Sequence, residues 1–161
     1  MTSFNFKMRL FAAIVAFFAA FTFCNAQTPV SAVTDSLAKL KTLDAAQPDT
    51  QYQIALVCLN YAVANPHAPE TGELMTEAEH AIQAMKALPT ADASQVATLQ
   101  GFYYTCRIVQ NPALNGALYY MDAMAYFEKA LELDPSNALA KHLQERFYEG
   151  MAKTMHALFD R

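Results

Sequence analysis

The chain is predicted to be all-α, and three features of its sequence support this class. Only four of the 161 residues are glycine, and the chain has no tryptophan and few alternating runs of β-branched residues. Apolar side chains recur at spacings of three and four, which is the period of one helix face. Prolines follow these stretches and indicate where helices end. Because no low-complexity linker divides the chain, we expect one helical domain behind an N-terminal targeting segment.

The N-terminal segment has the features of a secretory signal peptide. Lys7 and Arg9 precede an uncharged apolar stretch over residues 10–23, and small residues follow it. This stretch is shorter than the roughly 20 apolar residues that span a bilayer, which argues against an uncleaved anchor. We therefore predict a signal peptide over residues 1–26, a mature domain over residues 27–161, and a periplasmic location.

Cys24 leaves one alternative open. If Cys24 were acylated, it would become the mature N-terminus of a lipid-anchored envelope protein. Phe23 argues against this. It occupies the position before the cysteine, where such processing sites have a small residue, and its side chain is bulky. We expect membrane association only if Cys24 is lipidated.

The mature domain is predicted to be acidic. Lys7 and Arg9 leave with the signal peptide, so nine lysines and arginines remain against 15 acidic residues, a net charge of −6 over 135 residues. Negative charge repels phosphate groups, so we expect neither nucleic acid nor an anionic membrane surface as a partner.

Three helices are expected in the first half of the domain. Residues 30–46 have apolar side chains at helical spacing and end at a turn around Pro48. Residues 52–64 are broadly apolar and stop before Asn65-Pro66. Residues 74–88 carry one apolar stripe and close at Pro89. The side chains that define the first and third stretches are Val30, Val33, Leu37 and Leu40, and Leu74, Ala78, Ala81, Ile82 and Met85.

Three more helices are expected in the second half. Residues 93–110 stop at a second Asn-Pro pair, Asn111-Pro112, and residues 117–133 stop before Pro135. Residues 138–159 repeat an apolar residue every four positions, at Leu139, Leu143, Phe147, Met151 and Met155.

The two halves resemble each other when the chain is shifted by 46 residues. The shift places Asn65-Pro66 on Asn111-Pro112 and Pro89 on Pro135, so the expected helix ends coincide. A repeat of two helices cannot bury its apolar face alone. The outer stretches, residues 30–46 and 138–159, are therefore expected to cover the two ends.

Several residues resemble those of tetratricopeptide repeats. Ala123, Phe127 and Ala130, followed by Pro135, are similar to the second helix of such a repeat, in which small residues admit a neighbouring helix. Gly101 and Tyr104 resemble the glycine and tyrosine of the first helix. The resemblance implies antiparallel helix-hairpin repeats, about two of them with end helices, and it implies a protein-binding role.

The resemblance is not complete. About ten extra residues separate Tyr104 from Ala123 compared with the standard 34-residue unit, which implies a longer first helix or a loop. The stretch from Arg107 to Pro135 also resembles a group of exported, uncharacterised bacterial repeat proteins, and this similarity brings no catalytic activity with it.

First helices of stacked repeats form a concave surface, so the resemblance implies a binding groove there. By position relative to Gly101, the expected lining residues are Thr98, Phe102 and Thr105, with Tyr52, Leu56 and Asn60 as their equivalents in the earlier repeat. A wider aromatic set could line the same groove or, as is more common at this spacing, fill the core. That set also includes Tyr103, Tyr104, Arg107, Tyr119 and Tyr120.

One pair of residues has metal-ligand spacing. Glu77 and His80 share a helix face at i and i+3, as in di-iron helical bundles. The chain has no second Glu-x-x-His, and His142 and Glu145 occur in the reverse order. We therefore favour a solvated acidic face and assign no metal ligand. A helical-bundle metal or small-molecule binding protein remains the alternative function.

Cys58 and Cys106 lie near equivalent positions of the two expected first helices. An oxidising compartment would permit a disulfide between them. Alternatively, they are small buried residues. We favour unpaired thiols, because a disulfide needs Cα atoms within about 7 Å, whereas helix axes pack about 8–10 Å apart.

Motifs for catalysis are absent from the sequence. It contains no phosphate-binding glycine loop, no zinc-spaced cysteine pairs and no nucleophile elbow. We therefore expect a non-catalytic protein-interaction module or scaffold of the bacterial cell envelope, with no cofactor. Because about two repeats give only a short groove, a homodimer that extends the stack is an open alternative.

Overall fold

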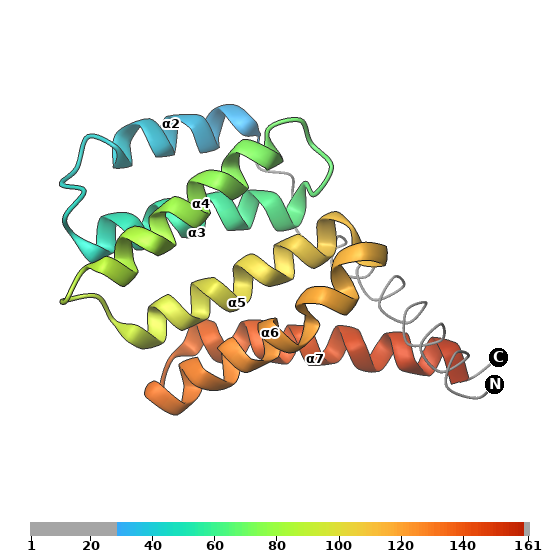
Figure 1. Cartoon of the computed structure of the whole chain (residues 1–161). Coiled ribbons are helices and arrows are strands. Elements are labelled where there is room, and N and C mark those ends of the chain that lie inside the picture. The colour runs from blue at the N-terminus through green and yellow to red at the C-terminus, as the bar shows by residue number, and fades with distance from the viewer. Residues whose placement is uncertain (1–28, 160–161) are drawn as a thin grey trace.

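A computed structural model of the chain describes residues 29–159, and this part of the protein is all-α. Figure 1 shows its helices, which are α2 (Val30–Leu40), α3 (Pro48–Ala64), α4 (Thr71–Ala87), α5 (Ala93–Gln110), α6 (Pro112–Leu133) and α7 (Ala138–Phe159). The predicted signal peptide, residues 1–26 with Cys24, lies outside the described residues. Within residues 29–159, no helix combines the length and apolar character needed to cross a membrane.

The helices pack mainly with their neighbours in the chain. α3 packs on α4 and α5 packs on α6, while α2 and α7 lie at opposite ends of the stack (Figure 1). α5 occupies the centre, because it contacts α3, α4, α6 and α7. Its buried side chains include Leu99, Phe102 and Cys106, which share one helix face, and Ile108, which lies on the opposite face. A helix that is buried on opposite faces is one that its neighbours surround.

Two prolines begin helices, which corrects the predicted starts at residues 52 and 117, whereas the predicted stop of the helix over residues 93–110 is confirmed. Pro48 and Pro112 are the first residues of α3 and α6, where the missing N–H costs no hydrogen bond. The Asn111 side chain caps α6 by accepting a hydrogen bond from the Leu114 N–H at 3.2 Å. The extra residues before Ala123 therefore belong to α6, the second helix of the α5–α6 pair. The prediction that they lengthen the first helix or form a loop is wrong.

The remaining boundaries differ mostly at helix starts. α2 stops at Leu40, six residues before the predicted end, and a turn follows in which Asp44 accepts a hydrogen bond from the Ala46 N–H at 2.9 Å. α4 begins at Thr71, whereas α5 and α7 have their predicted bounds. Ala64 and Gln110 end equivalent helices 46 residues apart, as the shift predicts.

A buried polar network fixes the end of α6 against α5. Ser94 Oγ donates to the Ala130 carbonyl at 2.8 Å, and Asn137 Nδ2 donates to Ser94 Oγ at 2.8 Å and to Thr98 Oγ1 at 3.1 Å. Asn137 Oδ1 also accepts from the Ala140 N–H at 3.0 Å and so caps α7. The network holds the last turns of α6, and with them the side chains described below, at a fixed position over α5.

Ala130 is the first site for a stability prediction. It is fully buried and packs with Ala97 and Ala140, so three small residues allow three helices to meet. Ala130→Leu is expected to overpack this contact and lower the free energy of unfolding by about 1–3 kcal/mol. Urea denaturation measures the effect, and Glu132→Leu at an exposed position of α6 is the control. Equal midpoints for the two variants would mean that α6 does not approach its neighbours through Ala130.

Candidate functional site

A hollow with a volume of about 330 Å3 lies where α4, α5 and α6 meet. We call it the tyrosine groove. α4 contributes polar side chains, and the aromatic side chains come from α5 and α6. Its lining residues are Glu79, Gln83, Lys86, Gln100, Tyr103, Tyr104, Arg107, Tyr119 and Tyr126.

Tyrosine rings and one guanidinium form the aromatic part of this groove. The Tyr104 ring stacks on Tyr119 with centroids 5.3 Å apart and lies 5.7 Å from the Tyr126 ring. Arg107 Cζ is 5.6 Å from the centroid of Tyr119, within the range of a cation–π contact. Tyrosine and arginine are enriched at protein interfaces, because each offers a large flat surface and hydrogen-bonding groups.

Hydrogen bonds to α4 hold the other side of the groove. The Tyr103 hydroxyl donates to Glu79 Oε2 at 3.1 Å, and Lys86 Nζ donates to Gln100 Oε1 at 2.7 Å. Arg107 Nε is buried without a hydrogen-bond partner among the described residues. The hydrogen bonds order α4 side chains around the groove, while one donor of Arg107 remains free.

Burial shifts the protonation equilibria of these groups. Burial raises the pKa of the Tyr103 hydroxyl, and the neighbouring Glu79 carboxylate raises it further. Burial also raises the pKa of Tyr104. The pKa of the Lys86 ammonium is lowered by burial and by Lys129, against the opposing effect of Glu79. Tyr103 and Tyr104 are therefore neutral hydrogen-bonding groups at neutral pH.

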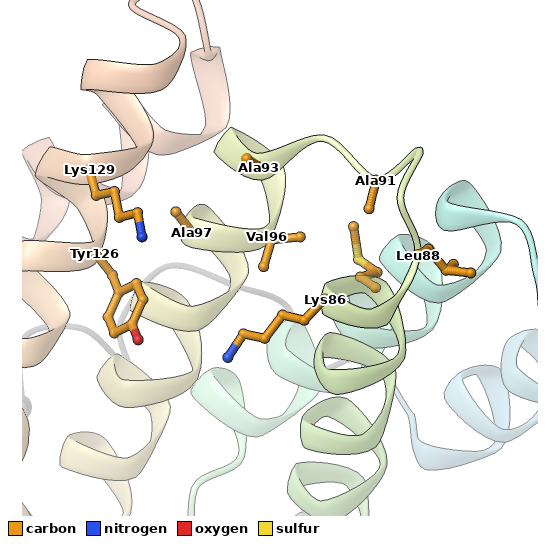
Figure 2. Close-up of a pocket in the computed structure, with 9 residues that line it drawn as sticks. Lys86, Leu88, Ala91, Ala93, Val96, Ala97, Tyr126 and Lys129 are labelled. Carbon is orange, nitrogen blue, oxygen red and sulfur yellow. The ribbon is translucent and has the colours of Figure 1, made fainter.

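A second hollow of about 320 Å3 continues from the tyrosine groove and shares Lys86 and Tyr126 with it. We call it the lysine hollow. Figure 2 shows Lys86 of α4 and Lys129 of α6 on opposite sides, with Val96 and Ala97 of α5 between them. Its lining residues are Met85, Lys86, Leu88, Ala91, Ala93, Val96, Ala97, Tyr126 and Lys129.

The groove predicted from the sequence does not lie where it was expected. Thr98, Phe102 and Thr105 are 1%, 1% and 2% exposed, so they face the interior. Thr98 Oγ1 and Thr105 Oγ1 donate to backbone carbonyls one turn earlier in α5. The prediction that these three residues line a surface groove is wrong, because α7 and α3 also cover α5.

The equivalents in α3 have mixed positions. Tyr52 and Leu56 are half-buried and pack against the core, and Asn60 is exposed. None of them lines the tyrosine groove or the lysine hollow, and neither does Thr98, Phe102 or Thr105.

The wider aromatic set from the sequence contains residues that line the tyrosine groove, whereas Thr98, Phe102 and Thr105 do not line it. Tyr103, Tyr104, Arg107 and Tyr119 meet in the tyrosine groove, whereas Tyr120 stacks on Phe147 at 5.3 Å in the core. The contribution of α4 was not predicted from the sequence. Glu79, Gln83 and Lys86 of α4 line the groove, and their spacings of four and three place these polar residues on one helix face beside the buried stripe. This polar face was the signal in the sequence.

Glu77 and His80, the pair with metal-ligand spacing, have no further candidate ligand beside them in the described structure. Glu77 forms an ion pair with Lys41 at 2.9 Å, and His80 is exposed. Within residues 29–149, no group of three histidine, cysteine or acidic side chains is placed to hold a metal ion.

Cys58 and Cys106 are free and buried in the described part of the chain. Cys106 Sγ lies 3.5 Å from the Leu59 carbonyl, which accepts its hydrogen bond. Burial raises the pKa of the Cys58 thiol to about 12 and also raises the pKa of Cys106. Protonated, enclosed thiols are poor nucleophiles, so neither cysteine has the features of a reactive site.

One face of α6 is apolar and uncovered. Leu114, Leu118 and Met121 are 62%, 58% and 69% exposed and lie at spacings of four and three. Exposed apolar residues that share a helix face are a feature of interaction surfaces. This stripe adds apolar surface to the same helix that supplies Tyr119 and Tyr126 to the groove.

Comparisons of this chain with protein-family models, with curated proteins and with solved structures found no match.

Proposed function

We propose that this protein is an exported, non-catalytic interaction module of the bacterial cell envelope, built from tetratricopeptide-like repeats and located in the periplasm. Two helix hairpins with ends 46 residues apart support the repeat organisation. The basic, then apolar segment at the N-terminus supports export. The role is to bind a protein or peptide partner, without nucleic acid.

The tyrosine groove is the observation on which this proposal rests. It gathers four tyrosines and an arginine from the central helix α5 and from α6, which packs on it. Such side chains supply most of the binding energy at protein interfaces when a partner covers them. The lining residues of the groove include no serine, threonine, cysteine or histidine, so the groove lacks a Ser–His or Cys–His pair and binding fits its chemistry better than catalysis.

A selection from random displayed peptides tests the proposal on the mature chain. We expect peptides that bind wild-type protein, and we expect Tyr119→Ala to weaken their binding by about 1–3 kcal/mol. Tyr119 is half-buried, so urea denaturation must show that the variant is folded during the binding measurement. Fluorescence anisotropy with a labelled selected peptide gives the dissociation constants.

Tyr148→Ala is the matched control. Tyr148 is 40% exposed on α7 and does not line either hollow. The Tyr148→Ala variant should therefore bind the selected peptides with the same affinity as the wild type. Failure to select any peptide, or equal binding by wild type and folded Tyr119→Ala, would contradict the proposed function of this groove.

A further inference from the structure

The lysine hollow has an unbalanced charge. Lys86 and Lys129 are its charged lining residues, and no carboxylate lines it. In Figure 2 the two side chains extend from α4 and α6 toward the space between these helices. Glu79 of the adjoining tyrosine groove attracts Lys86, whereas Lys129 has no carboxylate among the residues that line the hollow. An anion in the hollow would pair with Lys129 and offset its repulsion of Lys86, so the hollow suits a negatively charged group.

The two lysines differ in how they are held. Lys86 Nζ is fixed by its hydrogen bond to Gln100, a residue that is only 6% exposed. Lys129 is exposed, and the ion pair found in the described structure, between Lys41 and Glu77, does not involve it. One ammonium group is thus in place before binding, and the other is available to close on a ligand without breaking an ion pair.

The lining around the lysines is apolar. Val96 and Ala97 lie between them, Ala91 and Leu88 continue the apolar lining beyond Lys86, and the Tyr126 ring lies beside Lys129. The volume of about 320 Å3 lies at the low end of the range for ligand pockets, roughly 300–1,000 Å3. A phosphate ion alone would leave this apolar surface uncovered. An apolar side chain with carboxylates beside it would match both the apolar lining and the charges.

We propose that the lysine hollow seats an apolar side chain of an acidic peptide segment, and that carboxylates next to that side chain pair with Lys86 and Lys129. This inference rests on the proposed function and names the class of its partner. The rest of the segment continues into the tyrosine groove, which shares Lys86 and Tyr126 with the hollow. A mature domain of net charge −6 then binds an acidic partner through a local cationic site.

The peptide selection described above also tests this inference. Selected sequences should be enriched in aspartate and glutamate next to leucine, isoleucine or phenylalanine. One selected peptide is then synthesised with its carboxylates replaced by amides, and a second version has its apolar residue replaced by alanine. Each change should weaken binding about tenfold, because both the charges and the apolar side chain contribute to the contact.

Variants of the protein test the lysines directly. Lys129→Gln should weaken binding of the acidic peptide about three- to tenfold and reduce its dependence on salt, whereas Lys129→Arg should retain both. Lys39→Gln removes the same charge from an exposed position of α2 and should leave binding unchanged. Lys129 is exposed, so its substitution does not disturb the core.

The outcomes separate this inference from the proposed function. Selection of neutral or basic peptides, or unchanged binding by Lys129→Gln, would overturn the acidic-peptide inference and leave the tyrosine groove as a binding site. Displacement of the peptide by millimolar inorganic phosphate, with no effect of replacing its apolar residue, would identify a simple anion site and also overturn the inference. Selection of no peptide would overturn both proposals.

Discussion

Phe127→Ala is expected to lower the free energy of unfolding by about 3–5 kcal/mol, which is the usual cost of truncating a buried phenylalanine. Phe127 is completely buried, and its ring meets Phe147 edge-on with centroids 6.1 Å apart. It also fills the space over Gly101, where an added Cβ would lie 2.8 Å from its Cε1 atom. The ring therefore connects α5, α6 and α7, and its loss leaves a cavity between all three.

A second substitution, Gly101→Ala, tests this geometry, because its effect on the free energy of unfolding should reverse when the Phe127 ring is removed. Gly101→Ala should destabilise the wild type, since overpacking costs about 1–3 kcal/mol and exceeds the helix-propensity gain of about 1 kcal/mol. In the Phe127→Ala background the clash is gone, so the same change should stabilise the protein. Gly72→Ala in α4, where nothing lies within 4 Å of the added Cβ, is the control and should stabilise both backgrounds equally.

Urea denaturation of the single and double variants supplies all the free energies. The cycle isolates the contact between the two residues, because they touch and their effects cannot be additive. If Gly101→Ala has the same effect with and without the Phe127 ring, the close approach of α5 and α6 at Gly101 is contradicted.

Local signals explain which parts of the fold were predictable. The end of α5 was predictable because the Asn111-Pro112 pair follows it, and in the structure Asp92 caps its start by accepting from the Ser94 and Gln95 N–H groups at 2.7 and 3.0 Å. The helix starts at Pro48 and Pro112 were missed, since a proline in a turn is suited both to following one helix and to beginning the next. Only the turn length and caps, which depend on three-dimensional structure, decide between them.

The site was less predictable for a different reason. The spacing of Tyr104, Tyr119 and Tyr126 does not reveal that α4 side chains line the same groove, because α4 and α6 are brought to it by how each packs on α5. Lys129 is an ordinary exposed lysine in the sequence. It gains importance only from Lys86 across the lysine hollow, a residue 43 positions earlier in the chain.

Phe102→Ala is the second substitution with a large expected effect, and it distinguishes the core from a binding surface. Phe102 is 1% exposed within the main hydrophobic cluster, so truncation should lower the free energy of unfolding by about 3–5 kcal/mol. Phe102→Leu keeps most of the volume and should cost less than about 1.5 kcal/mol. Urea denaturation of both variants measures these differences.

Binding of the selected peptide provides the contrast with Tyr119. Because Phe102 has no surface to offer a partner, folded Phe102→Leu should bind the peptide with wild-type affinity, whereas folded Tyr119→Ala should not. A Phe102→Ala variant as stable as the wild type but deficient in peptide binding would place Phe102 on an exposed groove. That result would restore the concave surface formed by first helices as the binding site and exclude the tyrosine groove from that role.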